Sequence, residues 1–78
     1  MISADQIRAG RALANLSVKE LADRVGVGVH SIKRIENGKT SVAQMRAANI
    51  EGIQRALEGA GIVFLPDGYG VTKRQEEA

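Results

Sequence analysis

The chain has no cysteine and only one histidine, His30. Without cysteine it forms no disulfide, and a single histidine cannot assemble the nitrogen and sulfur ligands of a zinc site. We therefore expect no metal and no cofactor. A chain of 78 residues buries only a modest core. Its stability therefore has to come from good helix packing or from a second subunit. The lack of cysteine is also compatible with a reducing cytosol.

Long apolar runs are missing as well. No stretch approaches the roughly 20 apolar residues that cross a bilayer. The first five residues carry neither a basic nor an apolar segment, so we expect no secretory signal and a cytoplasmic protein without a membrane partner. No nucleophile and base stand out as a pair, and Glu20, Asp23 and Glu36 have helix-cap or surface explanations. We therefore expect that the protein is not an enzyme.

Charge is unevenly spread over the two halves of the chain. Residues 1–40 hold seven basic and four acidic side chains, whereas residues 41–78 hold four basic and five acidic ones. The net charge of the whole chain is +2. A bias this small is common on a solvated surface, and it adds only slight support for a nucleic-acid partner.

The first helix is predicted over residues 4–14. Ser3 can cap its start, and Asn15 is suited to the left-handed conformation that ends a helix. Gly10 inside this helix should cost about 1 kcal/mol relative to alanine.

The second helix has the clearest pattern in the chain. Ser17 and Glu20 form a capping box, in which each side chain can bond the other residue's backbone amide. Apolar residues then recur on one helical face, at Val18, Leu21, Ala22 and Val25. Gly26 is the expected end of the helix.

A short third helix is predicted over residues 29–37, ending at Asn37 and Gly38. Ile32 and Ile35 point inward in this interpretation. The other face carries an apolar group, an imidazole, an ammonium and a guanidinium, on Val29, His30, Lys33 and Arg34.

A fourth helical region covers residues 42–60, with an apolar stripe at Ile50, Ile53 and Leu57. Asn49 can cap a break near its middle, which leaves one long helix or two shorter ones. The tail then turns β-prone, with one strand at residues 62–65, a turn at Pro66, and a second strand at residues 69–72.

The strand at residues 62–65 has two interpretations. It can lie on the core of its own chain, or it can pair with its twin in a homodimer, because a lone hairpin is marginal in water and an edge strand accepts a partner. In the second case the dimerisation residues are Ile62, Val63, Phe64 and Leu65.

Two helices joined by a short turn that contains glycine form the general pattern of a DNA-reading unit, whose second helix lies in the major groove. The segment from Leu16 to Val27, with its Ser-x-x-Glu-Leu-Ala core, and the segment Ile32-x-x-Ile35-Glu36-Asn37-Gly38-Lys39 resemble the lambda-repressor-like, Cro-type (XRE) family of DNA-binding domains. The resemblance covers about residues 4–60.

The resemblance implies a role for each matching position. The base-reading residues are Val29, His30, Lys33 and Arg34, and the residues on the DNA backbone are Ser17, Val18, Asn37, Lys39 and Thr40. Arg34 suits guanine because its guanidinium can pair with O6 and N7, while Lys33 is equally suited to a phosphate. Arg11 and Glu36 match a buried ion pair between the first and third helices of the family.

Two positions depart from the family pattern. Gly28 stands where the recognition helix usually starts with serine or threonine, a difference of a few tenths of a kcal/mol because glycine is an acceptable cap. Gly10 stands where the family usually has an apolar residue, which bears on the packing of the first helix.

The expected fold is all-α: a bundle of four to five helices with a helix-turn-helix and a short C-terminal β-strand or hairpin. Residues 1–61 form the DNA-binding domain, and residues 62–78 a β-prone appendage for dimerisation followed by a frayed tail. The expected function is a transcriptional repressor that binds double-stranded DNA as a homodimer on a palindromic operator. Its half-sites should lie about one helical turn (roughly 34 Å) apart, or a multiple of it. The alternative is an antitoxin-like interaction module that binds a partner protein and regulates its own operon.

Overall fold

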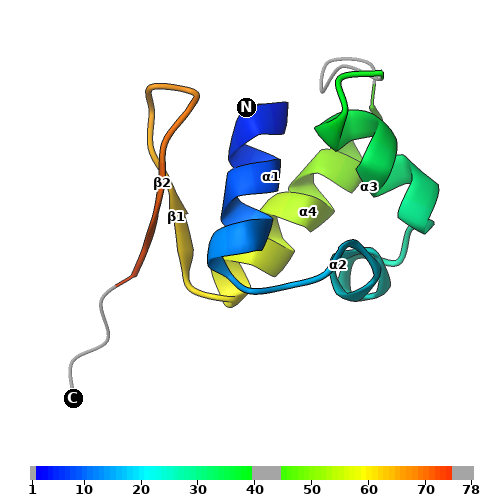
Figure 1. Ribbon diagram of the computed structural model, residues 1–78, viewed down its shortest axis with the longest axis horizontal. Helices are drawn as coiled ribbons and strands as arrows, with labels where there is room; N and C mark the ends of the chain where they lie inside the picture. Colours follow the sequence, from blue (N-terminus) through cyan, green and yellow to red (C-terminus); the bar gives the residue numbers. More distant parts are fainter. Residues whose placement is uncertain (1, 40–44, 75–78) are drawn as a thin grey trace.

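A computed structural model describes residues 2–39 and 45–74 of the chain. Figure 1 shows the helices α1 (Ala4–Leu13), α2 (Val18–Val25), α3 (Val29–Glu36) and α4 (Ala47–Gly59), followed by the strands β1 (Ile62–Phe64) and β2 (Val71–Lys73). This arrangement confirms the predicted all-α fold with a C-terminal hairpin.

The fourth helix differs from its prediction in two ways. The first predicted residues, 42–44, lie outside the part of the chain that the structure describes, and the helix begins at Ala47 after a non-helical Met45 and Arg46. The break suggested at Asn49 is wrong, because α4 runs without interruption to Gly59 and Asn49 lies in its first turn.

Local hydrogen bonds explain where α1 and α2 start and stop. A capping box opens each helix: Ser3 with Gln6 in α1, and Ser17 with Glu20 in α2. Asn15 follows α1 with a φ of 62°, and Gly26 ends α2 with a φ of 84°. Both residues occupy the left-handed region that the sequence predicts for them.

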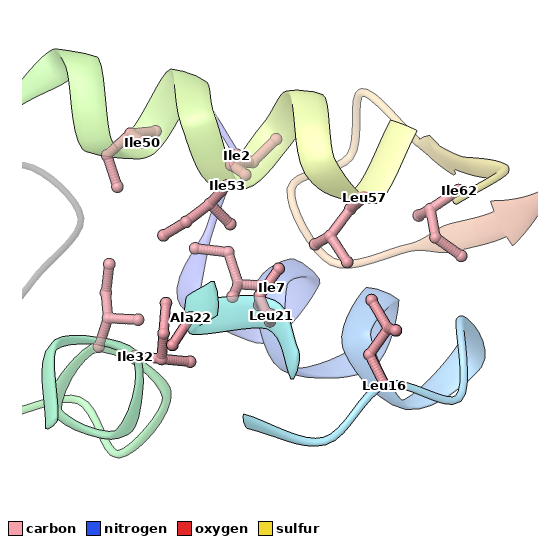
Figure 2. Close-up of a cluster of buried hydrophobic side chains, with 11 residues drawn as sticks. Ile2, Ile7, Leu16, Leu21, Ala22, Ile32, Ile50, Ile53, Leu57 and Ile62 are labelled. Atoms are coloured by element: carbon pink, nitrogen blue, oxygen red, sulfur yellow. The ribbon is translucent and has the colours of Figure 1, made fainter. Parts of the chain in front are cut away.

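One hydrophobic cluster joins all four helices and the first strand. Its largest members are completely buried, among them Ile7, Leu21, Ile32, Ile35, Ile53 and Leu57. Figure 2 shows the isoleucines and leucine of α4 pointing toward the other three helices, with Ile50 above α3 and Ile62 extending the cluster to the hairpin. Ile62 is only 2% exposed, so the strand lies on the core of its own chain.

The hairpin is antiparallel, with Val63 opposite Thr72 in its register. It packs against α1 and α4, at the end of the molecule opposite α3 (Figure 1). Gly10 makes this packing possible: a Cβ there would lie 3.3 Å from Ile62 Cγ2 and 3.4 Å from Leu57 Cδ1. The departure from the family pattern at Gly10 is therefore matched by the close approach of the hairpin.

Gln6 fixes the hairpin to α1. Its side-chain amide donates to the carbonyls of Leu65 at 2.8 Å and Gly70 at 2.9 Å, while its side-chain oxygen accepts from the amide of Ser3. The Ser3 hydroxyl donates to the carbonyl of Gly68 at the hairpin tip. Gln6 is only 1% exposed, so these bonds are shielded from water.

Candidate nucleic-acid interface

The two helices of the α2–α3 pair begin with different local hydrogen bonding. The Ser17 hydroxyl accepts from the amide of Glu20 at 3.0 Å, and the Glu20 carboxylate accepts from the amide of Ser17 at 2.9 Å. These bonds with Ser17 lower the pKa of the Glu20 carboxyl. Gly28 precedes α3 in an extended conformation and offers no side-chain cap. The second helix of the pair therefore starts with a weaker local signal than the first.

The inner face of α3 is fixed by Ile32 and Ile35, which are both completely buried. The side chains of His30, Lys33 and Arg34 are therefore directed to solvent, and all three residues are exposed. Val29, the fourth predicted base reader, is half-buried and packs against the core.

A shallow concavity of about 520 Å³ brings five of the predicted DNA-binding residues together. They are His30, Lys33 and Arg34 from α3, with Asn37 and Lys39 from the loop that follows it. Ser17 and Val18 do not line it, because they lie at the start of α2. Thr40 lies outside the residues that the structure describes.

A second hollow borders the first and shares Arg34 with it. It is lined by Ser31, Arg34, Met45, Arg46 and Asn49. Sequence reasoning missed Arg46, which lies inside the helix predicted over residues 42–60; its closeness in the sequence to the loop after α3 was an available signal. Arg46 is the N-cap of α4, and its side chain makes no cap hydrogen bond.

The cations that line the two hollows lie outside the ion pairs of the described residues. Among the described residues, the ion pairs join Arg8 to Asp5, Arg11 to Glu36 and Lys19 to Asp23. None of them involves the cations of the two hollows, Lys33, Arg34, Lys39 and Arg46. Uncompensated positive charge gathered on one face creates a potential that attracts a polyanion.

Arg11 and Glu36 lock α3 against α1. Arg11 Nε donates to Glu36 Oε2 at 2.7 Å and Arg11 Nη2 to Glu36 Oε1 at 2.8 Å, a two-pronged pair that is 20% exposed on the arginine and 6% on the glutamate. The hydrogen bonds to Glu36 raise the pKa of the Arg11 guanidinium. Arg8 Nη1 donates to the Glu36 carbonyl at 2.6 Å, so two arginines of α1 hold the last residue of α3.

Among residues 2–39 and 45–74, no helix has the length and apolar character that a membrane crossing requires. The concave, cationic face around α3 is instead suited to the sugar–phosphate backbone and base edges of a nucleic acid.

Comparison with known proteins agrees with this geometry. The sequence model of a helix-turn-helix family matches residues 7–52, which is more than half of the chain and covers most of α1, all of α2 and α3, and the first part of α4. No curated protein matches the chain. The matched family consists of DNA-binding regulators rather than enzymes. The chain belongs to the lambda-repressor-like, XRE-type helix-turn-helix family and is a DNA-binding transcription regulator.

Proposed function

We propose that this protein is a transcriptional repressor that binds, as a homodimer, an operator with two-fold symmetry. The observation that carries the DNA-reading part is the concavity at α3, where His30, Lys33 and Arg34 stand beside Asn37 and Lys39. A helix with exposed polar side chains on one face and buried isoleucines on the other has the form that enters a major groove.

The residues divide into two groups by the contact each one suits. Arg34 reads a guanine through its planar fork, and Val29 and His30 contact neighbouring base edges. Lys33 reaches either a base or a phosphate. The backbone contacts belong to Ser17, Val18, Asn37, Lys39 and Thr40, and we add Arg46 because it borders Arg34 in the second hollow.

Two single substitutions test this division. Arg34→Ala should reduce binding to the operator more than binding to a random duplex, because it removes a base contact worth about 1–3 kcal/mol. Lys39→Ala should weaken binding to both duplexes by the same factor. It should also reduce the slope of log binding constant against log salt concentration by about one. Arg55→Ala is the matched control, since Arg55 is exposed on α4 and lines neither hollow.

The operator sequence is identified by selecting the duplexes that the protein binds from a random pool. Gel shifts on the selected duplex and a scrambled one, at several salt concentrations, then compare the variants. Equal losses on the two duplexes for Arg34→Ala would contradict the base-reading role.

The edge of β1 that pairs with no strand among the described residues supports the homodimer. The amide of Leu65 donates to the Gly70 carbonyl and the amide of Arg74 to the Gly61 carbonyl, so the odd-numbered residues of this strand bond β2. The backbone groups of Ile62 and Phe64 therefore point to the other edge. Residues 62–65 carry no charge, whereas Lys73 ends β2 and Arg74 follows it. A charge-free edge is the one that accepts another strand.

A second copy suits this edge because an antiparallel pair centred on Val63 is self-complementary. Ile62 of one copy would face Phe64 of the other, and Phe64 of the first copy would face Ile62 of the second. This reciprocal pairing is what a two-fold interface requires. The exposed side chains of Val63, 40% accessible, and Leu65, 39% accessible, would lie close to the contact.

The antitoxin-like alternative draws on the same apolar side chains, together with Tyr69, which is 73% exposed. Light scattering after size exclusion separates the two functions. A dimer that Val63→Lys converts to a monomer favours the repressor. A wild-type monomer with the hairpin still exposed favours a partner protein.

A further inference from the structure

Arg8 of α1 holds the point where α3 passes into the loop that follows it. Its Nη1 donates to the carbonyl oxygen of Glu36 at 2.6 Å, and its Nη2 donates to Asp5 Oδ1 at 2.7 Å. Glu36 is the last residue of α3. Its carbonyl lies in the same rigid peptide plane as the amide of Asn37. Because the guanidinium of Arg8 is a planar fork with both prongs bonded, it fixes the orientation of this plane.

The peptide plane between Glu36 and Asn37 determines where the loop residues stand. The amide of Asn37 donates back to the Lys33 carbonyl at 2.9 Å, and the amide of Lys39 donates to the Arg34 carbonyl at 2.9 Å. Asn37 and Lys39 are exposed, so backbone hydrogen bonds rather than buried side chains hold them. A rotation of the plane would therefore carry both side chains away from the concavity that they line with Arg34.

Arg8 itself stands beside the DNA-reading surface rather than on it. Of the residues that the structure describes, it lines neither of the two hollows at α3. Both hydrogen-bond partners described for its guanidinium belong to this chain, and one of them is the carboxylate of Asp5, which balances its charge. The guanidinium is therefore arranged to hold the loop rather than to bind a phosphate directly.

We propose that Arg8, oriented by Asp5, is a positioning residue of the DNA interface. By holding the last peptide plane of α3, it directs Lys39 and its loop toward the sugar–phosphate backbone. The role differs from that of Arg11, which pairs with the Glu36 carboxylate and locks α3 as a whole against α1. The inference rests on the backbone contacts proposed above for this loop.

A double-mutant cycle on DNA binding separates positioning from direct contact. Arg8→Met and Lys39→Ala should each weaken binding to the operator and to a random duplex about three- to tenfold, because backbone contacts carry no sequence information. If Arg8 acts through the loop, the double variant should bind at least about threefold more tightly than the product of the two single losses predicts. Losses that multiply would show a direct phosphate contact of Arg8 and overturn the positioning role.

Asp5→Ala tests the same role with the opposite change in charge. Loss of a carboxylate makes the protein more cationic, and charge alone would tighten its binding to DNA. Positioning predicts the reverse: without Asp5, Arg8 holds the loop less firmly, and binding to both duplexes should weaken about two- to fivefold. The matched control, Asp23→Ala, removes a carboxylate that pairs with Lys19 on the surface of α2, and it should leave the affinity unchanged or raise it. An affinity that is unchanged or higher in Asp5→Ala would contradict the proposal.

Amide exchange of the free protein gives a measurement that needs no DNA. Arg8→Met should speed exchange at the amide of Lys39 at least about threefold more than at the amide of Ile53, which lies in the middle of α4 and reports unfolding of the core. A variant that is merely less stable would speed exchange at Ile53 by as much or more, and that result would overturn the positioning role. If Arg8→Met does not fold, Asp5→Ala should give the same local change by a smaller factor.

The outcomes also separate this inference from the function on which it rests. A Lys39→Ala variant that binds both duplexes as tightly as the wild type would overturn the proposed backbone contact and, with it, the role of Arg8. A loss of binding in Lys39→Ala, combined with no loss or an independent loss in Arg8→Met, would overturn the positioning role alone and leave the DNA-binding function intact.

Discussion

Gly10 marks the tightest point between α1 and the hairpin. Gly10→Val adds three carbons where Ile62 Cγ2 and Leu57 Cδ1 already lie within 3.4 Å of a Cβ. We expect unfolding free energy to fall by about 1–3 kcal/mol, because overpacking moves the strand or forces poor rotamers. Gly59→Ala is the control, since a Cβ there meets nothing within 4 Å. Urea denaturation compares them, and a Gly10→Val protein as stable as the control would refute the close contact.

The Arg11–Glu36 pair allows a second comparison within one helix. Arg11→Met leaves a carboxylate that is only 6% exposed without its partner, and should cost about 3–5 kcal/mol. Arg8→Met removes a cation that is 51% exposed, together with its hydrogen bond to the Glu36 carbonyl, and should cost about 1 kcal/mol, clearly less than Arg11→Met. Thermal unfolding followed by circular dichroism measures both losses. Similar losses of stability for the two variants would show that burial does not determine how much the Arg11–Glu36 pair contributes.

At the scale of elements, the α2 cap gives a pH dependence. Bonds with Ser17 lower the pKa of Glu20 below its ordinary value of 4.5. A carboxyl whose pKa falls on folding adds stability above its unfolded pKa, and this contribution is lost as the pH drops through the folded value. Asp67, whose pKa is lowered by the amides of Gly70 and Tyr69, acts in the same direction.

We therefore expect stability to decline as the pH falls below about 4.5, and Glu20→Gln to decline less steeply. Denaturation midpoints at neutral pH and at successively lower pH values test this expectation. Lys19→Gln is a control on the same helix, because its partner Asp23 lies on the exposed surface. Parallel pH curves for wild type and Glu20→Gln would contradict the role of the cap.

The helices were more predictable from sequence than the contacts between them. The box at Ser17 and the left-handed residues Asn15 and Gly26 are local signals, so sequence reasoning placed the ends of α1 and α2 to within one residue. The pairing of Arg11 with Glu36 came only from the family resemblance. It could not be derived from periodicity, since the two residues are 25 positions apart.

Gln6 and Gly10 show what sequence reasoning could not reach. Each is explained by the hairpin, which is more than 50 residues away along the chain. Gln6 reads as an ordinary first-turn residue, and Gly10 as a helix-weakening one. Because the hairpin packs on α1, Gln6 becomes a buried hydrogen-bond donor. For the same reason, position 10 has little room for a side chain.

At the scale of the whole molecule, the hairpin shares the core of the helices. Ile62→Ala should lower the unfolding free energy by about 2–4 kcal/mol, because it empties space beside Leu57 and Gly10. Helix and hairpin should still unfold together in one transition, seen by circular dichroism and by amide exchange. Val63→Ala, at a side chain 40% exposed, should cost much less. A hairpin that melts separately while the helices stay intact would contradict the shared core.

The two ends of α3 are held very differently. Its last residue is gripped by both arginines of α1, whereas its first turn follows an uncapped glycine. The helix is therefore fixed at its C-terminal end by hydrogen bonds from α1. We expect its first turn, which carries Val29 and His30, to be more mobile. Amide exchange should be faster over its first turn than over its last. A reading helix with one compliant end can adjust to the base edges it meets without loosening its attachment to the rest of the molecule.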